Sequence, residues 1–480
     1  MRAPVLWPRQ TRSPARAWRA VSQWSSDGAL DALVPWAVAR LDEQGRGEFV
    51  LTAPDRGGSA PLLRAAPRLE PLSPPMRNVT VSKILAGGRT PNNKEAEEGR
   101  PRVERYYYSG SLHEVSTAHW ATQAIVDDLS PLDDLKLRDA PPLPADAALR
   151  PPDDGLSAPA PENRTSLRLW LTSAGVLART HYDKSHNVLC VLRGRKEVVL
   201  WPPEELPALH LYPAIHTAHR QSQISTMDLD GVREAVSGGR TAEAVGILGD
   251  YPLLDAAALL GGRGAQSARL AAGDCLYTPP YWAHAVFSPE ASVALAAFST
   301  SWEQARWARS GWLRAPLGRF AAGGICSKAR GAALLITAFL HACSAVLDGT
   351  PRTFLANLYA ARFAPIYGAL HSVAPGSQAL SDCLAANDRG ADTLPPDAPE
   401  RDPSLRRRVR AFGASIADLL VEADETAGWR RFSAGVASEL AADYVEELAG
   451  WACGADGAWR LLRLLATTEE TDLEHTPRAT

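Results

Sequence analysis

The sequence has little of what marks a secreted, membrane-spanning or nucleic-acid-coating protein. The net charge is only -3 over 480 residues, so no overall field favours an anionic polymer or a lipid surface. The longest apolar run, residues 331–347, contains a histidine and is shorter than the roughly 20 residues that cross a bilayer, so we interpret it as a buried helix. The six cysteines form no CxxC pair, and we interpret them as reduced thiols.

Reduced thiols favour a reducing compartment. We therefore predict a cytoplasmic or nuclear protein with no membrane partner. The arginine-rich N-terminus has no acidic residue before Asp27, so organelle targeting is the alternative. The length of 480 residues corresponds to roughly three domains of average size.

Composition and pattern divide the chain into four regions. Residues 1–138 mix helix and strand signals and are expected to form an N-terminal α/β segment that packs on the next domain. Residues 139–163 are rich in proline, alanine and aspartate, which predicts a loop or disordered insertion. Residues 164–303 contain short apolar runs between turn signals, typical of an all-β sandwich or barrel, with an insertion at 228–266.

The fourth region, residues 304–470, is helical by pattern. The apolar periodicity predicts helices over 329–347, 352–370, 405–424 and 427–449. Their apolar stripes are equally consistent with burial inside one chain and with a homodimer interface.

A candidate metal site begins in the stretch "THYDKSHN", residues 180–187. Residues i and i+2 of a strand share a face, so His181 and Asp183 are expected to point the same way, with Tyr182 opposite. A polar turn is the other interpretation of this pair. His284, in "PPYWAHAVF", is the best third ligand, whereas His186 has the wrong parity relative to His181. Two histidines and one carboxylate leave coordination positions open, which suits non-haem Fe(II).

A lysine in an apolar strand follows the candidate ligands. Lys196 comes after an Arg-Gly turn in "LRGRKEVVLWPP", and its strand is expected to pair antiparallel with "NVLCVL", residues 187–192. The lysine lies either at the edge of a sheet with its charge in water, or inside, paired with an anion such as the far carboxylate of 2-oxoglutarate. The strand alone does not separate these alternatives.

Taken together, the motifs resemble a known family. "RYYYSGSL", "THYDKSHNVLCVLRGRKEVVLWPPEEL", "HRQSQIS", "LAAGDCLYTPPYWAHAVFS" and the "SW" at 301–302 occur in the order found in JmjC-type, cupin-like Fe(II)/2-oxoglutarate-dependent oxygenases. The similarity is greatest to the small hydroxylases, which include the asparaginyl hydroxylase that inhibits hypoxia-inducible factor and the tRNA wybutosine-synthesising hydroxylase. The matching residues cover about 100–303.

The resemblance implies a double-stranded β-helix (jelly-roll or cupin) barrel, a mainly β core with a C-terminal helical region. It implies that His181, Asp183 and His284 bind Fe(II). The cosubstrate 2-oxoglutarate would contact residues at the matching positions, which are Lys196, Tyr107, Asn187 and Ser299, and Thr180, which lies close to a matching position. Two positions depart from the pattern, since Ala178 replaces a threonine and Ser299 replaces an asparagine.

The implied activity is hydroxylation with 2-oxoglutarate and O₂ as cosubstrates and release of succinate and CO2. A protein side chain is the first expected substrate and a modified tRNA base the second, the basic run "RRRVR" at 406–410 being a candidate phosphate contact. Histone demethylation is a weaker option, because the sequence shows neither a reader domain nor a basic tail. A catalytically weak or inactive JmjC-like binding protein is the alternative from another class.

Overall fold

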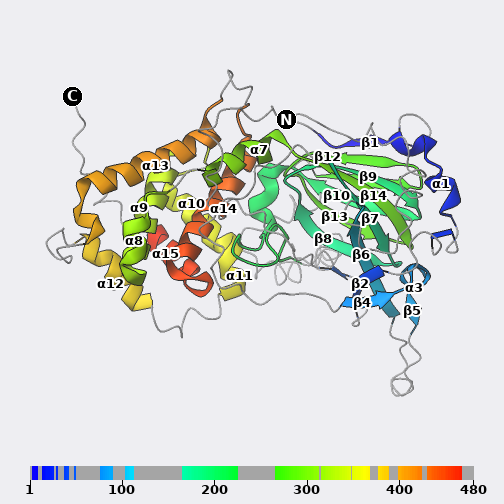
Figure 1. Ribbon diagram of the computed structural model, residues 1–480, viewed down its shortest axis with the longest axis horizontal. Helices are drawn as coiled ribbons and strands as arrows, with labels where there is room; N and C mark the ends of the chain where they lie inside the picture. Colours follow the sequence, from blue (N-terminus) through cyan, green and yellow to red (C-terminus); the bar gives the residue numbers. More distant parts are fainter. Residues whose placement is uncertain are drawn as a thin grey trace, which may run out of the picture.

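The computed structural model has two parts that lie side by side, a β barrel and a helical region (Figure 1). The structure describes residues 3–8, 13–25, 29–30, 37–42, 48–49, 76–89, 103–112, 165–224, 265–312, 315–347, 349–367, 377–388, 398–423 and 430–467. The expected loop at 139–163 and nearly all of the expected insertion at 228–266 lie outside these residues.

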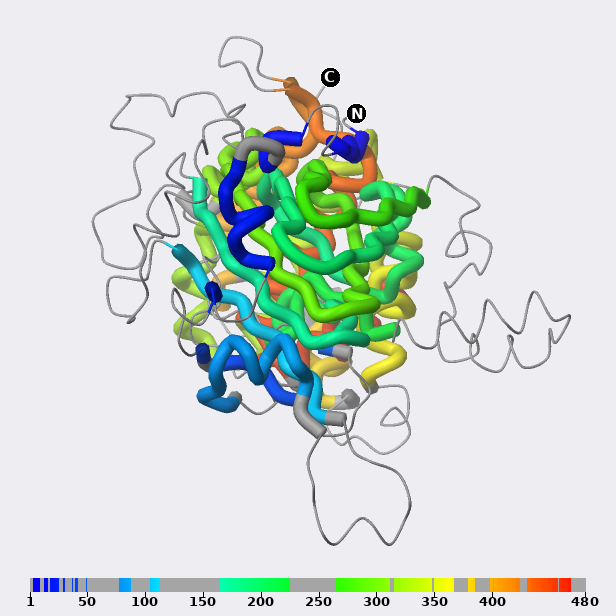
Figure 2. The backbone as a smooth tube through the Cα atoms, turned by 90° about the vertical axis from the view of Figure 1, so that its right-hand side faces the viewer, coloured from blue at the N-terminus to red at the C-terminus, as the bar shows by residue number. Residues whose placement is uncertain are grey.

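The larger sheet of the barrel combines strands from both ends of the barrel sequence. Its order is β1-β12-β9-β14-β7-β6-β2-β4, with β5 paired to β6, so N-terminal strands complete it on either side. Figure 2 views the barrel from its free end, with the blue N-terminal segment lying across the outside of the strands. The bounds are β1 Val5–Trp7, β2 Ala37–Asp42, β4 Met76–Val79, β5 Gly88–Arg89, β6 Val103–Ser111, β7 Thr165–Thr172, β9 His186–Arg193, β12 Cys275–Thr278 and β14 Ser292–Ser299.

The smaller sheet carries the residues expected to bind metal. Its order is β11-β10-β13-β8-β3, and all its pairs are antiparallel except the parallel pair of β3 with β8. The bounds are β3 Glu48–Phe49, β8 Val176–Tyr182, β10 Arg195–Trp201, β11 Gln266–Ala271 and β13 Ala283–Ser288. Two facing antiparallel sheets confirm the predicted jelly-roll barrel.

The expected pairing of the Lys196 strand with residues 187–192 is wrong. β10 pairs with β11 and β13, whereas β9 pairs with β12 and β14 in the other sheet. The chain passes from β9 in one sheet to β10 in the other at Gly194, whose φ of 74° is favourable for glycine. A Cβ on Gly194 would also collide with the Ala291 carbonyl. The tight turn therefore carries the chain from one sheet to the other and forms no hairpin.

A β-bulge on β8 sets which side chains of that strand face the barrel interior. His181 pairs with His284 and Ala178 pairs with Val286, so two residues of β8 oppose a single residue of β13. The extra residue reverses the alternation, and Ala178 and His181 line the same cavity although they are three positions apart.

The helical region follows the barrel and packs against one end of it (Figure 1). Three of its helices start at capped positions: Thr350, Asp402 and Ser433 each accept a hydrogen bond from a backbone N–H in the first turn. The bounds are α7 Trp302–Ala308, α8 Gly318–Ala322, α9 Gly324–Ala342, α10 Pro351–Leu358, η9 Tyr359–Phe363, α11 Ala364–Tyr367, α12 Ser377–Asp388, α13 Pro403–Val421, α14 Ala434–Cys453 and α15 Ala455–Thr467.

Short helices connect the remaining elements. On the barrel side they are η1 Pro14–Ala17, α1 Ala20–Gln23, α3 Val81–Ala86 and η6 Pro203–Leu209, and in the helical region η8 Arg309–Trp312 and η12 Pro399–Arg401. No described helix is long and apolar enough to cross a membrane, and the apolar run at 331–347 lies mostly in α9, as predicted.

The interpretation of all six cysteines as reduced thiols is wrong for four of them. Cys190 and Cys275, on β9 and β12, form a disulfide, and so do Cys326 and Cys383. The first pair was not predicted because its members are 85 residues apart and meet only through the β9–β12 register. The predicted cytoplasmic or nuclear location therefore no longer has the support of reduced cysteines.

Candidate metal centre and active-site cavity

A cavity of about 760 Å³ lies between the two sheets. Alternate residues of several strands line it because successive side chains of a strand point to opposite faces. The cavity brings together most of the site residues expected from the sequence. These are Tyr107, His181, Asp183, Asn187, Lys196 and His284.

Three of these residues form a metal-ligand group. His181, Asp183 and His284 each offer one ligand atom, and the three atoms lie within 4.8 Å of one another. The Nε2 atom of His284 is 3.6 Å from a carboxylate oxygen of Asp183, and the two imidazole centroids are 4.4 Å apart. The register of β8 with β13 creates this closeness by placing His181 directly opposite His284.

The hydrogen bonds of the two histidines prepare them as ligands. The Nδ1 of His181 lies 2.8 Å from the Arg179 carbonyl, and the Nδ1 of His284 lies 3.1 Å from the Trp282 carbonyl. A carbonyl only accepts, so each Nδ1 carries the hydrogen and each Nε2 keeps a lone pair for a metal. Burial, helped by the charge of His284, lowers the pKa of His181 to about 4, so this ring is neutral at pH 7.

Asp183 is held as a carboxylate. Burial alone would raise its pKa, but the two imidazoles, Arg220 and a hydrogen bond outweigh it, and the pKa is lowered. That bond comes from the Asn187 amide at 3.1 Å. The backbone carbonyl of Asp183 accepts from the Tyr281 N–H at 2.7 Å. Asn187 thus contacts a metal ligand directly, while its contact with cosubstrate stays a prediction.

Lys196 lies inside the barrel, which settles the question that the strand left open. It is 3% exposed, and its ammonium donates to the Ser288 hydroxyl at 3.0 Å. Thr172 donates to the same hydroxyl at 3.1 Å and lies 2.6 Å from Ser292. Burial lowers the pKa of Lys196 to about 7, because no carboxylate of the described residues compensates its charge. A buried cation surrounded by hydroxyl groups is suited to binding the carboxylate of a ligand.

Tyr107 lines the cavity from the larger sheet. Its ring stacks on Phe49 at 5.4 Å, and burial raises the pKa of its phenol. The hydroxyl makes no hydrogen bond to a described residue and remains available to a ligand.

Two other predicted cosubstrate contacts lie elsewhere. Thr180 and Ser299 are buried and are not among the residues that line the cavity. The β8 bulge explains why Thr180 does not line the cavity. The Ser299 hydroxyl lies 3.1 Å from the Thr165 hydroxyl. Their cosubstrate roles stay predictions. His186 hydrogen-bonds the Tyr277 hydroxyl at 2.9 Å and faces the outer core, in agreement with its parity.

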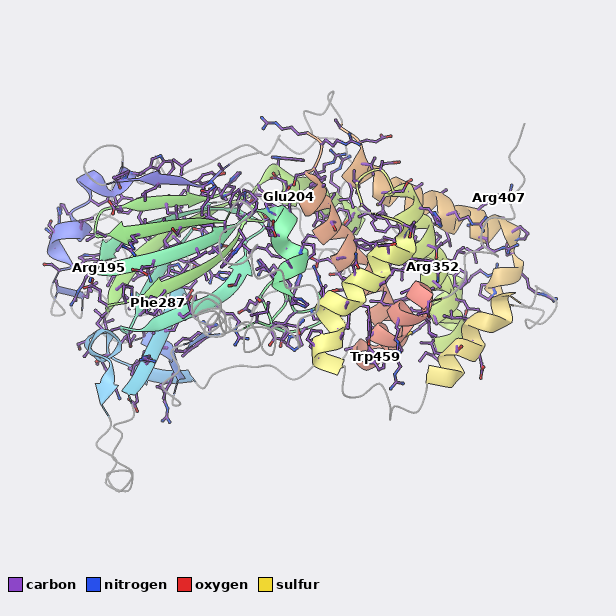
Figure 3. All side chains as sticks on the ribbon, turned by 180° about the vertical axis from the view of Figure 1, so that it is seen from behind. Arg195, Glu204, Phe287, Arg352, Arg407 and Trp459 are labelled. Carbon is purple, nitrogen blue, oxygen red and sulfur yellow. A yellow bond between two sulfur atoms is a disulfide. The ribbon has the colours of Figure 1, made fainter. Side chains whose placement is uncertain are left out.

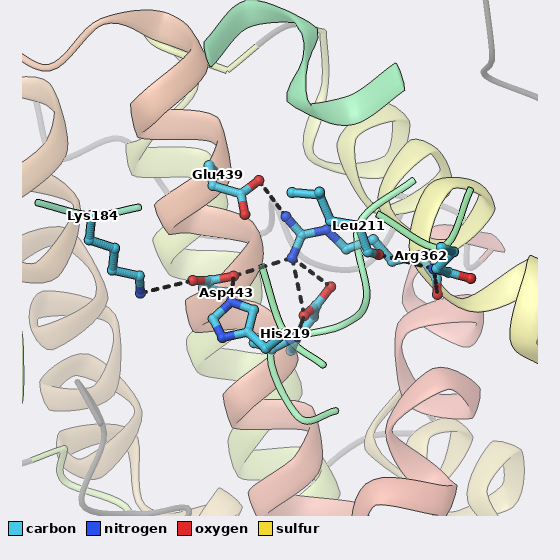
Figure 4. Close-up of polar contacts among 9 residues, drawn as sticks. Lys184, Leu211, His219, Arg362, Glu439 and Asp443 are labelled. Carbon is cyan, nitrogen blue, oxygen red and sulfur yellow. Dashed lines mark hydrogen bonds and ion pairs between the residues drawn. The ribbon is translucent and has the colours of Figure 1, made fainter. Parts of the chain in front are cut away.

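A buried cluster of charges joins the metal end of the barrel to α14 (Figure 4). Glu439, Asp443 and Glu446 lie one turn apart on α14 and face Arg362 of η9. Arg362 donates to these carboxylates at 2.5 to 3.3 Å. Burial raises the pKa of Glu446 to about 8 and raises that of Glu439 as well, whereas the charges of His219, Lys184 and Arg362 overcome burial and lower the pKa of Asp443.

The same cluster holds the segments that flank Asp183. Asp443 accepts from the Lys184 ammonium at 3.3 Å and bonds His219 at 3.0 Å. The neighbour of His219, Arg220, accepts the Tyr182 backbone N–H through its carbonyl at 3.1 Å. His219, Glu439 and Asp443 also have metal-like spacing, but Arg362 already neutralises these carboxylates. The His181 group is therefore the stronger candidate for a metal site.

Several cavity residues were not predicted from the sequence. The alternation of Ser166, Arg168, Trp170 and Thr172 on β7 is the signal that could have identified them, since all four line the cavity. Such alternation normally marks a solvated face, and only the closed barrel turns it inward. Ser288 and Thr172 supply hydroxyls near Lys196, in the region where Ala178 lacks one.

Comparison with known proteins agrees with this geometry. A family model described as "Cupin-like domain" matches residues 10–301, more than half of the chain. The chain is 34% identical over 131 residues to Lysine-specific demethylase JMJ31 of Arabidopsis thaliana, covering 27% of this chain and 20% of that protein. It is 31% identical over 128 residues to tRNA wybutosine-synthesizing protein 5 of Gallus gallus, covering 27% of this chain and 31% of that protein.

A third relative is Jumonji C domain-containing protein 5 of Drosophila melanogaster, 30% identical over 129 residues, which cover 27% of this chain and 26% of that protein. The jelly roll with a His-Asp-His site defines the class as a JmjC-type oxygenase fold, the family predicted from the motifs. The chain belongs to the cupin-like family, whose JmjC members characteristically depend on Fe(II) and 2-oxoglutarate. It spans between a fifth and a third of the length of these relatives.

Proposed function

We propose that the protein is an Fe(II)- and 2-oxoglutarate-dependent dioxygenase that hydroxylates a protein side chain and releases succinate and CO2. One observation carries the proposal: a His-Asp-His ligand group and a buried, carboxylate-free Lys196 line the same cavity. A barrel that only bound a partner through its surface would have no use for a buried cation in the same cavity as a metal-ligand group.

The donor set fits the iron. Two imidazoles and one carboxylate would hold Fe(II) and leave positions for cosubstrate and oxygen. When bound, the iron supplies the oxidising chemistry, and the protein supplies position and shelter. Asn187 fixes the Asp183 carboxylate, and the Nδ1 bonds fix the two rings.

The cosubstrate would be oriented by the far end of the cavity. Lys196 would pair with the distal carboxylate of 2-oxoglutarate, and Ser288 and Tyr107 would add hydroxyl contacts. The Lys196 ammonium gains a partner in this arrangement, and its buried charge is no longer uncompensated.

A second candidate is hydroxylation of a modified tRNA base. It is favoured by the similarity to tRNA wybutosine-synthesizing protein 5 and by the arginines 406, 407, 408 and 410 on α13. Figure 3 shows Arg407 at the far end of the helical region, away from the barrel. The distance of this basic face from the cavity makes the tRNA substrate the second choice.

Mass spectrometry distinguishes the two substrates. Cells that contain wild-type protein are compared with cells that contain the Asp183→Ala variant, for a +16 Da change in peptides and in tRNA nucleosides. The proposal predicts a wild-type-dependent +16 Da on peptides. A change confined to nucleosides would replace the protein substrate with tRNA, and a demethylation without +16 Da products would replace hydroxylation.

A further inference from the structure

Three hydroxyl side chains form a buried cluster next to Lys196. They are Thr172 of β7, Ser288 of β13 and Ser292 of β14, and each is at most 1% exposed. The register pairs Ser292 directly with Thr172, and their hydroxyls lie 2.6 Å apart. Thr172 and Ser288 line the cavity, whereas Ser292 is not among the residues that line it. The cluster therefore reaches from the core of the barrel to the cavity wall.

The hydrogen bonds of this cluster converge on the Ser288 oxygen. It accepts from the Lys196 ammonium at 3.0 Å, and Thr172 and Ser292 point toward it as donors at 3.1 and 3.3 Å. A hydroxyl carries one hydrogen, so one of these two hydrogens forms the bond between Thr172 and Ser292 and the other reaches Ser288. In either direction the chain of hydroxyls ends on Ser288.

The hydrogen of Ser288 itself is left over. The ammonium and the hydroxyl chain fill the two lone pairs of its oxygen, so Ser288 can only donate further. None of the described residues accepts from this hydroxyl, and Ser288 lines the cavity. Lys196 also keeps N–H groups beyond the one that it donates to Ser288. Together they form a site that offers only donors, which is suited to a carboxylate.

Strand β13 connects this site to the metal ligands. His284, Val286 and Ser288 line the cavity at alternate positions of this one strand. The same inner face thus carries a metal ligand near one end and the Ser288 hydroxyl at the other. Ser288 pairs with Val176 of β8, two residues before Ala178. It therefore supplies a hydroxyl one position along the wall from the alanine that lacks one.

We propose that Ser288 binds the far carboxylate of 2-oxoglutarate beside Lys196, and that Thr172 and Ser292 are positioning residues that turn the Ser288 hydrogen toward it. This inference rests on the proposed function. The chain of hydroxyls occupies the Ser288 oxygen as an acceptor, so its hydrogen is directed into the cavity, and successive hydrogen bonds strengthen one another. The motifs of the sequence assign no role to Thr172 or Ser292.

A purely structural cluster would behave differently. Buried hydroxyls that only satisfy one another stabilise the barrel, and their loss affects folding whatever ligand is bound. The ligand 2-oxopentanoate separates the two roles, because it has the same keto-acid end and a methyl group in place of the far carboxylate. Only a residue that acts on the far carboxylate changes the ratio of the two affinities.

The test measures the Kd of both ligands by calorimetry on the full chain loaded with Mn(II), so that no turnover occurs. Ser288→Ala is expected to weaken 2-oxoglutarate about tenfold or more and 2-oxopentanoate little. Thr172→Val and Ser292→Ala are each expected to weaken 2-oxoglutarate about threefold, again with little effect on 2-oxopentanoate. Thr172→Ser retains the hydroxyl and should bind both ligands like wild type, and the melting temperature of each variant without ligand reports folding.

A double variant separates positioning from direct contact. Because Thr172 acts through Ser288, Thr172→Val should weaken 2-oxoglutarate no further when Ser288→Ala is already present. Thr353→Val is the control, since it also removes a hydroxyl that bonds another hydroxyl, that of Thr350 at 3.0 Å, but at the start of α10. It should leave both affinities unchanged.

Equal losses for the two ligands, or wild-type affinity for 2-oxoglutarate in Ser288→Ala, would overturn the inference. Wild-type affinity in both Thr172→Val and Ser292→Ala, or a Thr172→Val loss that persists beside Ser288→Ala, would overturn the positioning role. In each case the proposed function stands as long as Lys196→Met binds 2-oxoglutarate more weakly than wild type. Wild-type protein that binds neither ligand would contradict both proposals, a result distinct from all the others.

Discussion

Lys196 shows how much one side chain can reveal about a site. Its place in an apolar strand predicts either a lysine at the edge of a sheet or an internal anion site. Its burial in the structure shows that it lies inside the barrel. The metal ligands were predictable because His181 and Asp183 obey strand parity and His284 lies on a separate apolar strand. The cavity residues Arg168 and Trp170 of β7 were not predictable, because the inward and outward faces of a strand become distinct only when the barrel closes.

The pH dependence of cosubstrate binding tests the state of Lys196. Burial lowers its pKa to about 7 in the empty cavity, and a bound carboxylate favours the charged form. Below pH 7 the lysine is already protonated, so affinity is flat. Above pH 7 binding must take up a proton, and the Kd of 2-oxoglutarate should rise about tenfold per pH unit.

Titration calorimetry at about pH 8.5, in buffers of different ionisation enthalpy, measures the proton directly. The expected result is uptake of close to one proton in wild-type protein and none in Lys196→Met, whose weaker binding should also lose its pH dependence. A wild-type Kd that is constant between about pH 6.5 and 8.5 would contradict this account of Lys196.

At the scale of elements, α14 contacts the segments beside the candidate metal site from outside the barrel. The Asp443 carboxylate on α14 bonds both Lys184 and His219. Lys184 follows Asp183 directly, and His219 precedes Arg220, whose carbonyl accepts the Tyr182 backbone N–H. Asp443→Asn should therefore weaken Mn(II) binding about tenfold, the usual cost of disturbing a residue that orients a ligand. It should also lower the free energy of unfolding by about 3 kcal/mol, because Arg362 and Lys184 lose a buried counterion.

Equilibrium dialysis with Mn(II) and urea unfolding give the two numbers. Glu290→Gln is a suitable control because it removes a carboxylate from the solvent-exposed ion pair with Arg195. An Asp443→Asn variant that loses stability but binds Mn(II) as tightly as wild type would limit α14 to a structural role.

Element-level predictions succeeded where the pattern is local and failed where pairing is long-range. The helix predicted over 405–424 from its apolar period is confirmed as α13, Pro403–Val421. The predicted antiparallel pairing of β9 with β10 was wrong, because a glycine turn between two strands can also carry the chain from one sheet to the other. The disulfide between Cys190 and Cys275 depends on that same sheet order and was missed with it.

At the scale of the whole molecule, the barrel and the helical region share one core. A continuous apolar cluster runs from Tyr182 and Trp201 of the smaller sheet to Phe339 of α9 and Leu448 of α14. Within the part of the chain that the structure describes, the apolar face of α14 is thus covered by its own chain. The homodimer through the C-terminal helices stays a prediction.

The shared core predicts cooperative unfolding. 2-Oxoglutarate at about 100 times its Kd should stabilise the Mn(II)-loaded protein by about a further 2.7 kcal/mol. Because the helices share the core of the site, the helical circular dichroism signal at about 222 nm should shift to higher temperature in a single transition. A helical transition that does not move when the ligands bind would show that the two parts unfold independently.

Cosubstrate turnover tests the central claim most directly. Purified protein with Fe(II), ascorbate and 2-oxoglutarate should form succinate slowly even without a prime substrate, and His181→Ala and Asp183→Ala should abolish it. Wild-type protein that forms no succinate, and whose melting temperature does not respond to 2-oxoglutarate with a metal present, would contradict the assignment as an oxygenase.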